Sequence, residues 1–126
     1  MVLKLKVIPG TYAVCRLDPD ADVPGWASDG RISSITKTDE ELSIVCLEAR
    51  VPKGVLSEKG WRCIKIQGPL PFSMTGVLAS VVKPLAEAGI SLFAFSTYDT
   101  DYILVKEEAL DSALSALARA GHEIKN

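Results

Sequence analysis

The sequence is poor in the residues on which most catalytic and nucleic-acid-binding sites depend. Of its 126 residues, one is histidine, three are cysteine and 6% are aromatic. The formal net charge of −2 supplies no basic field for a phosphate backbone, and the aromatic residues are too scattered to suggest a base-stacking platform. We therefore expect no nucleic-acid partner.

The few cysteines and the single histidine do not form a recognisable reactive motif. Cys15, Cys46 and Cys63 lie too far apart for a CxxC pair, and their apolar, strand-like surroundings favour small buried thiols. His122 follows the helix-stopping Gly121, where a solvated or edge-strand histidine is favoured over a catalytic one. The sequence shows no nucleophile and base pair, metal cluster or phosphate-binding lysine, so we expect no enzyme activity, no metal and no cofactor.

Long apolar runs are also missing. No stretch reaches the roughly 18 residues that a membrane-spanning helix needs, and the N-terminus lacks the layout of a signal peptide. We therefore expect a cytoplasmic protein with no membrane partner. The hydrophobic fraction of 48% is still ample for the core of one compact domain or of two small, closely packed units.

The C-terminal half has a regular pattern. "RCIKI" predicts a strand, and the Gly/Pro-rich loop "QGPLPFSMTG" leads into an amphipathic helix over residues 75–88. Pro84 removes one hydrogen bond of this helix, which predicts a bend or an irregular last turn. Two strands, "ISLFAFS" and "YILV", precede a second helix over residues 107–120 and a short final strand. This β-α-β-β-α-β order predicts an α+β, ferredoxin-like fold, with two helices on one face of an antiparallel sheet.

The N-terminal half looks like a degenerate copy of the C-terminal half. A shift of 60 residues brings Asp39 onto Asp99 and Val45 onto Val105, which suggests a tandem duplication. The segment "LKLKVIPGTYAVCRL" predicts two strands around Pro9 and Gly10. The following loop has at most one helical turn, around residues 24–27, and Trp26 is expected to cover the core.

The chain also carries a family resemblance. The run "GPLPFSMTGVLASVVKPLAEAGISLFAFSTYDTDYILV" resembles the ACT domain, the ferredoxin-like regulatory module of amino-acid biosynthetic enzymes. The whole chain is similar to small stand-alone bacterial proteins built from two tandem ACT-like units, and it also resembles the CASTOR-type cytosolic arginine sensors. The resemblance implies a degenerate ACT-like unit at residues 1–60 and an ACT domain at residues 61–126.

The family resemblance implies a non-catalytic regulatory or sensor protein. Its ligand would be a free amino acid, bound where the first loop and helix of one unit meet a neighbouring unit. The site residues carried over by position come from the helix opening and from the segment "STYDTD". They are Ser73, Thr75, Gly76, Val77, Thr97, Tyr98, Thr100 and Asp101. Thr100 stands where the arginine sensors carry an aromatic residue, which argues against arginine as the ligand.

The chemistry of these residues agrees with an amino-acid site. Asp99 and Asp101 lie between two strand-like runs, although strands disfavour aspartate. Asp99 is the better turn residue, whereas Asp101 is the better partner for an ammonium group or a basic side chain. Gly76 would allow a carboxylate to approach the amides at the helix start. The alternative is that both aspartates only shape a hairpin and that Gly76 only starts the helix.

Two other functions stay open at this point. The chain could be a protein-interaction module that dimerises and retains no ligand site, or, less favoured, a small enzyme. An antiparallel sheet of this size leaves an edge strand, which predicts a two-fold symmetric homodimer with side-by-side sheets or facing helices. Two tandem units within one chain could meet the same need. A sensor would also require a regulated protein partner.

Overall fold

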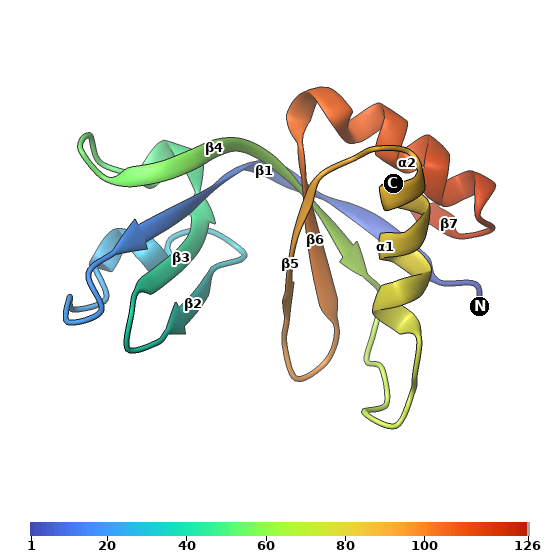
Figure 1. The fold of residues 1–126 in the computed structure, drawn as a ribbon, viewed down its shortest axis with the longest axis horizontal. Coiled ribbons are helices and arrows are strands. Elements are labelled where there is room, and N and C mark those ends of the chain that lie inside the picture. Colours follow the sequence, from blue (N-terminus) through green and yellow to red (C-terminus); the bar gives the residue numbers. More distant parts are fainter. Residues whose placement is uncertain (126) are drawn as a thin grey trace. The chain divides into compact units, whose positions relative to one another are not determined.

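The structure, a computed structural model, describes residues 1–125 and divides into two units. Unit 1 contains residues 1–9 and the chain from Arg62 onward, and unit 2 contains residues 10–61. Two long strands, β1 (Lys4–Leu17) and β4 (Leu56–Ile66), contribute residues to both units (Figure 1). The predicted division into residues 1–60 and 61–126 stays a prediction, but the structure groups the first nine residues with the C-terminal unit.

Unit 1 has the predicted β-α-β-β-α-β order, which confirms the α+β, ferredoxin-like fold. After β4 come α1 (Val77–Glu87), β5 (Leu92–Ser96), β6 (Asp101–Lys106), α2 (Leu110–Arg119) and β7 (Glu123–Lys125). A short 3-10 turn, η3 (Glu107–Ala109), leads into α2. The strand order is β7-β1-β4-β6-β5, so the first strand of the chain joins this sheet between β4 and β7. In the described chain, no helix is long and apolar enough to cross a membrane.

The core of unit 1 lies between the sheet and its two helices, which Figure 1 draws on the same side of the sheet. Alternate residues of each strand point to this side, and the apolar stripe of each helix covers them. The fully buried members are Leu5, Ile64, Ile66, Val81, Leu85, Ile103, Val105, Ala113 and Leu117. The predicted amphipathic stripe of the first helix is therefore confirmed at Val81 and Leu85.

Pro84 leaves one carbonyl group of α1 without its usual helical donor. The oxygen of Ser80 would accept from the backbone amide four residues later, but proline has no N–H. The Nε2 atom of His122 lies 2.9 Å from this oxygen. Its Nδ1 atom accepts a hydrogen bond of 3.1 Å from the backbone N–H of Leu3, so the ring proton sits on Nε2 and is donated to Ser80.

His122 therefore joins the start of the chain, α1 and the segment before β7. His122 is 5% exposed, so the expectation of a solvated histidine was wrong, although the residue directly precedes β7, the strand at one end of the sheet order. The physical reason is that the carbonyl oxygen freed by Pro84 and the amide of Leu3 both need a partner in the interior. A neutral imidazole, with one donor and one acceptor, satisfies both.

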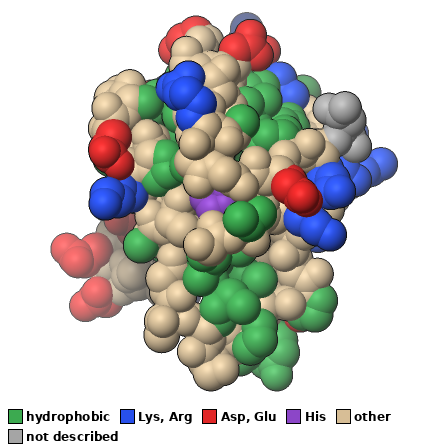
Figure 2. All heavy atoms as spheres, turned by 90° about the vertical axis from the view of Figure 1, so that its right-hand side faces the viewer, with side chains coloured by type: hydrophobic (Ala, Val, Ile, Leu, Met, Phe, Trp, Pro, Cys, Tyr) green, Lys and Arg blue, Asp and Glu red, His purple; other side chains and the backbone are tan. Residues whose placement is uncertain are grey.

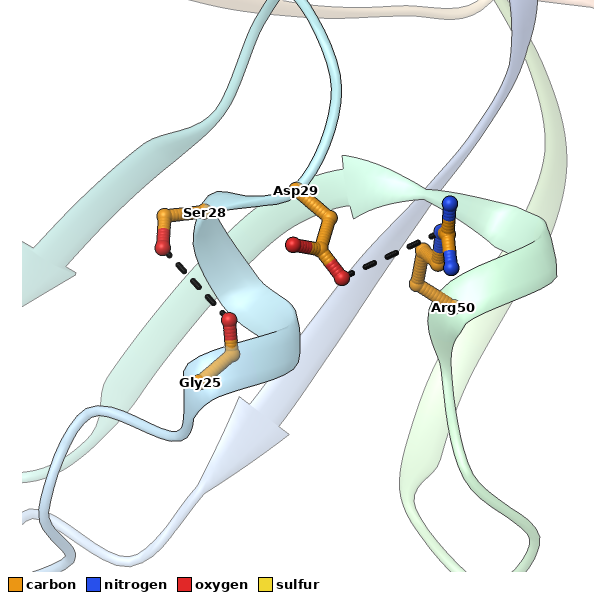
Figure 3. Close-up of polar contacts among 4 residues, drawn as sticks. All are labelled: Gly25, Ser28, Asp29 and Arg50. Atoms are coloured by element: carbon orange, nitrogen blue, oxygen red, sulfur yellow. Dashed lines mark hydrogen bonds and ion pairs between the residues drawn. The ribbon is translucent and has the colours of Figure 1, made fainter.

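Unit 2 repeats the order of unit 1 with 3-10 turns in place of helices. Between its parts of β1 and β4 lie η1 (Gly25–Ser28), β2 (Ser34–Lys37), β3 (Leu42–Leu47) and η2 (Glu48–Arg50). Its buried core consists of Ala13, Cys15, Ala27, Leu42, Ile44 and Cys46. Trp26 packs against this core, as predicted. Figure 3 shows Asp29 pointing to Arg50, with 3.9 Å between carboxylate and guanidinium, and Ser28 turned back to the carbonyl of Gly25.

The first strand differs from its prediction. The sequence predicts two strands around Pro9 and Gly10, but β1 is continuous through both residues. Its two ends pair with different neighbours, residues 4–6 with β7 and residues 12–17 with β3. Pro9 and Gly10 lie between these two pairings. The missing N–H of proline and the positive φ of Gly10 (107°) therefore remove no hydrogen bond from either pairing.

The internal repeat is present, but its offset is 59 residues. β3 and η2 correspond to β6 and η3 at this offset, and residues 43–47 then share their burial pattern with residues 102–106. The sequence match at 60 is wrong by one position. In a strand, a one-residue slip moves every side chain to the opposite face, so burial identifies the register where sequence identity does not.

Candidate functional site

A hollow of about 270 Å³ lies in unit 1 between the loop that follows β4 and the hairpin that joins β5 to β6. Its volume is close to the lower end of the range for small-molecule sites. The loop wall consists of Leu70, Pro71, Phe72, Met74 and Val77, and the hairpin wall consists of Ser96, Thr97, Tyr98, Asp99, Thr100 and Asp101.

One backbone and one side-chain hydrogen bond hold the two walls together. The N–H of Leu70 donates to the carbonyl oxygen of Asp99 at 2.8 Å. The hydroxyl of Thr100 donates to the carbonyl oxygen of Ile66 at 2.5 Å, at the end of β4. Gly68 permits this approach, because a Cβ atom there would lie 2.9 Å from the oxygen of Asp99. The shape of the hollow thus depends on a glycine that the sequence pattern did not single out.

The hairpin turn is fixed by its own threonine. The backbone N–H of Thr97 donates to the carbonyl of Thr100 at 2.8 Å, and the Thr97 hydroxyl lies 3.2 Å from the same oxygen. The N–H of Thr100 in turn donates to this hydroxyl at 3.3 Å. Thr38 makes the corresponding bonds to Glu41 in the unit 2 hairpin, again at an offset of 59 residues. Thr97 therefore has a structural role in addition to lining the hollow.

The charge in the hollow is negative. Asp99 and Asp101 belong to its wall, and no lysine, arginine or histidine does. One carboxylate oxygen of Asp101 accepts a hydrogen bond from the hydroxyl of Ser96, its partner across the β5–β6 pair. Asp101 therefore presents a fixed carboxylate, whereas Asp99 uses its backbone oxygen to hold the loop. The role of Asp101 as a ligand residue stays a prediction.

The start of α1 forms the opposite side of the hollow. Val77 is the first residue of the helix and lines the hollow, and no side chain caps this helix end. Unpaired amides and the helix dipole give such an end a partial positive charge. Gly76 precedes the helix with φ 77°, a left-handed conformation that glycine adopts without strain. The left-handed backbone conformation at position 76 therefore explains why glycine is found there.

Two exposed aromatic rings form the rim. Phe72 and Tyr98 are 76% and 81% exposed, and their rings meet edge to face with centroids 4.9 Å apart. Figure 2 shows hydrophobic side chains gathered at the lower edge of the molecule, where Figure 1 draws the loop between β4 and α1. Exposed aromatic groups of this kind mark surfaces that bind a ligand or a partner.

The structure brings together five of the eight site residues predicted from the family. Val77, Thr97, Tyr98, Thr100 and Asp101 line the hollow, whereas Ser73, Thr75 and Gly76 are exposed and lie outside its lining. Thr100 is 4% exposed, and its hydroxyl already donates a hydrogen bond to the carbonyl oxygen of Ile66. Sequence reasoning missed Leu70, Phe72 and Met74, for which the only signal was their place in a Gly/Pro-rich loop.

The thiols and the histidine of the described residues lie in structural surroundings. Cys15, Cys46 and Cys63 are free and buried, as predicted. Burial raises the pKa of Cys63 to about 12, and burial together with the Cys15 thiol raises the pKa of Cys46 to about 12. Both nitrogen atoms of His122 are engaged with backbone groups. Within the described residues, no group of three or more metal-binding side chains exists.

Two protein-family models match this chain, one in each half. The family model described as an ACT domain matches residues 56–119, and a second model, described as an N-terminal domain, matches residues 10–54. A protein from Agobacterium tumefaciens with an X-ray crystal structure is 44% identical, with a TM-score of 0.94 over 99% of this chain and 93% of that chain.

The chain is also similar to a protein named as an arginine sensor and to one named as a regulatory subunit. The human "Cytosolic arginine sensor for mTORC1 subunit 1" is 40% identical over 60 residues, which are 47% of this chain and 18% of that protein. This chain thus spans less than a fifth of that relative's length. The ligand-free regulatory subunit of aspartate kinase from Thermus thermophilus has a TM-score of 0.65 at 13% identity, over 96% of this chain and 99% of that one. At that identity the likeness concerns the fold alone.

Proposed function

Since this chain belongs to the ACT domain family, we propose that it is a non-catalytic regulatory protein that binds a free amino acid in the hollow beside the β5–β6 hairpin. One juxtaposition carries the proposal: the carboxylate of Asp101 lies on one wall and the uncapped start of α1 on the other. The name of one relative, a cytosolic arginine sensor, supports an amino-acid-sensing role.

The two walls match the two charges of an amino acid. An α-carboxylate is stabilised by the amides and dipole at the start of a helix. An ammonium group, or a basic side chain, forms a charge-assisted hydrogen bond to a carboxylate. Because the lining contains two aspartates and no cationic side chain, we expect aspartate and glutamate to bind more weakly than neutral or basic amino acids.

A thermal-shift screen against the proteinogenic amino acids tests the proposal. A ligand at about 100 times its dissociation constant adds roughly 2.7 kcal/mol to the free energy of unfolding, a clear shift of the melting curve. If no amino acid at millimolar concentration moves the melting temperature and calorimetry detects no heat, the amino-acid site is refuted.

The substitution Asp101→Asn tests which group receives the cation. Asparagine can still accept the Ser96 hydrogen bond but removes the charge, so ligand affinity should fall by roughly 1.5–3 kcal/mol with little change in the stability of the ligand-free protein. Asp99→Asn is the matched control, because the contact of Asp99 to the loop uses its backbone oxygen. Equal, small losses from both substitutions would exclude the role given to Asp101.

We also propose that the protein acts in the cytoplasm as a two-fold symmetric homodimer that contacts a regulated protein. β5 ends the strand order of unit 1, so its outer backbone groups have no strand neighbour within that order. Pairing between two copies would cover this edge, and the exposed aromatic rim could contact a partner. Light scattering at high protein concentration that gives only monomer would refute the dimer.

A further inference from the structure

One row of side chains crosses all five strands of unit 1 on the face away from the helices. Leu5, Ile66 and Ile103 point into the helix-covered core, so their strand neighbours point to the opposite face. In strand order from β7 to β5, the row consists of Lys125, Lys6, Lys65, Tyr102 and Phe95.

Each step of this row follows from an observed contact or register. Lys6 pairs with Lys125 in the β1–β7 register. The backbone N–H of Gln67 donates to the carbonyl oxygen of Lys4, so these two residues lie opposite each other. Because β1 and β4 run in opposite directions, this register places Lys6 beside Lys65.

The next two steps lead onto aromatic rings. The ammonium group of Lys65 lies 6.0 Å from the ring centre of Tyr102. Tyr102 in turn pairs with Phe95, and their rings are stacked at 5.1 Å with an interplanar angle of 6°.

The row combines two chemistries in a fixed order, three ammonium groups followed by two parallel aromatic rings. Lys6, Lys65, Tyr102 and Phe95 are half-buried, and Lys125 is exposed. Adjacent strands are about 4.8 Å apart, so Tyr102 and Lys125 are separated by three spacings, about 14 Å. The carboxylate of Glu123 lies 4.0 Å from the ammonium group of Lys125, so an acidic group lies beside the row.

From this row we propose that the helix-free face of unit 1 binds a nucleotide. The base stacks on the face of Tyr102 that is turned away from Phe95, where the ammonium group of Lys65 lies in the ligand-free protein, and Phe95 supports the ring from its other face. Lys65 then turns, with Lys6 and Lys125, toward the phosphates. Aromatic rings stack on any base through its π-face, and lysine binds phosphate as a point charge. A base joined to a chain of phosphates has the same order of groups as the row.

A mononucleotide fits this face better than a nucleic-acid chain. Polymer binding depends on many phosphate contacts along an extended basic surface. Here three lysines stand on one row of a protein whose net charge is −2, so a long polyanion would meet repulsion beyond the row. A nucleotide carries its few phosphates within the span of the row. This face is distinct from the hollow beside the hairpin, so the proposal is independent of amino-acid binding.

An amide chemical-shift titration of the full chain with ATP at millimolar concentration tests the proposal. The residues whose amides shift should be those of β1, β4, β5, β6 and β7 around the row. The double substitution Lys6→Gln with Lys65→Gln should weaken ATP binding about tenfold, and the effect should shrink as salt is added. Tyr102→Leu keeps an apolar residue in the sheet and should weaken binding at least about fivefold through lost stacking.

Matched controls separate the nucleotide from simpler explanations. Lys83→Gln removes an exposed lysine from α1, on the helix side, and should leave ATP binding unchanged. Adenosine and tripolyphosphate, which lack the phosphates and the base respectively, should each bind more weakly than ATP.

The proposal is overturned if ATP shifts no amide, if the double substitution binds ATP as the parent does, or if tripolyphosphate binds as tightly as ATP. Binding of a single-stranded oligonucleotide through the same amides at lower phosphate concentration would also overturn it, because the face would then serve a polymer.

Discussion

At the scale of single residues, a proline and a histidine from distant parts of the chain compensate for each other. Proline at position 84 removes the helical donor for Ser80, and His122 replaces it from outside the helix. A buried carbonyl without any partner would cost on the order of 1–3 kcal/mol. The histidine that stands out in the sequence by its rarity therefore has a structural explanation.

A double-mutant cycle measures this compensation. His122→Ala leaves the amide of Leu3 and the carbonyl of Ser80 without partners, so the free energy of unfolding should fall by about 2–4 kcal/mol. In a Pro84→Ala background the new N–H of residue 84 can serve Ser80, and the same substitution should cost about 1 kcal/mol less. Urea unfolding of the four proteins gives both values. Identical costs in the two backgrounds would show that Pro84 and His122 are not coupled.

Gly68 acts at the same scale on the candidate site. In Gly68→Ala the new Cβ would meet the oxygen of Asp99 at 2.9 Å and Thr100 Cβ at 3.1 Å, so the loop must move away from the hairpin. Stability should fall by about 1–3 kcal/mol, and amino-acid affinity should fall with it. Gly25→Ala is the control, because nothing lies within 4 Å of a Cβ there. Chemical unfolding and calorimetry check both effects, and a neutral Gly68→Ala would contradict the packing argument.

At the scale of elements, the two hairpins show what the repeat retains. Each uses a threonine three positions before the last residue of its turn, with the same backbone bond and the same side-chain bonds. The helices of unit 1 have no helical counterpart in unit 2, whose described elements outside its strands are the 3-10 turns η1 and η2. The hairpin geometry is thus common to both units, whereas the hollow also requires the loop and helix that follow β4.

The repeat supplies a matched pair of substitutions. Thr97→Val and Thr38→Val each remove a hydroxyl from equivalent turns, so each should lower stability by about 1 kcal/mol. Only Thr97→Val should also weaken amino-acid binding, since Thr97 lines the hollow and Thr38 lies in the other unit. Melting curves with and without ligand separate the two effects. A comparable loss of affinity in Thr38→Val would contradict the placement of the site.

At the scale of the whole molecule, buried thiols link stability to alkaline pH. The folded chain keeps Cys46 and Cys63 protonated to about pH 12, whereas in the unfolded chain thiols lose their protons near pH 9. The unfolded state therefore binds fewer protons above pH 9, and the free energy of unfolding must fall as the pH rises from there toward 12. Below pH 9 both states are protonated and this dependence disappears.

The substitution Cys63→Ala isolates one of these contributions. Each thiol accounts for at most about 1.4 kcal/mol per pH unit between its unfolded and folded pKa. Unfolding free energies at pH 9 and above should therefore decline less steeply in the variant than in the parent, by about this amount. An unchanged slope would mean that the Cys63 thiol ionises equally in both states.

Much of the fold could be read from the sequence because it depends on local patterns. The stripe from Val77 to Leu85, the β-rich run "YILV" and the breaks at Gly89 and Gly121 predict element type and order without knowledge of contacts. The assignment of Asp99 as a turn residue and Asp101 as a ligand residue came from residue chemistry and stays a prediction. Burial of the three cysteines followed from their apolar neighbours.

The features that join residues far apart in the chain could not be predicted from the sequence and became visible only in the folded protein. The amide of Leu3 meets His122 across 119 positions, and the hydroxyl of Thr100 meets Ile66 across 34. The continuity of β1, the need for glycine at position 68 and the lysine–aromatic row all depend on which strands become neighbours and in which register. Pairing and register are set by packing of the complete core, and a local sequence pattern carries no information about distant partners.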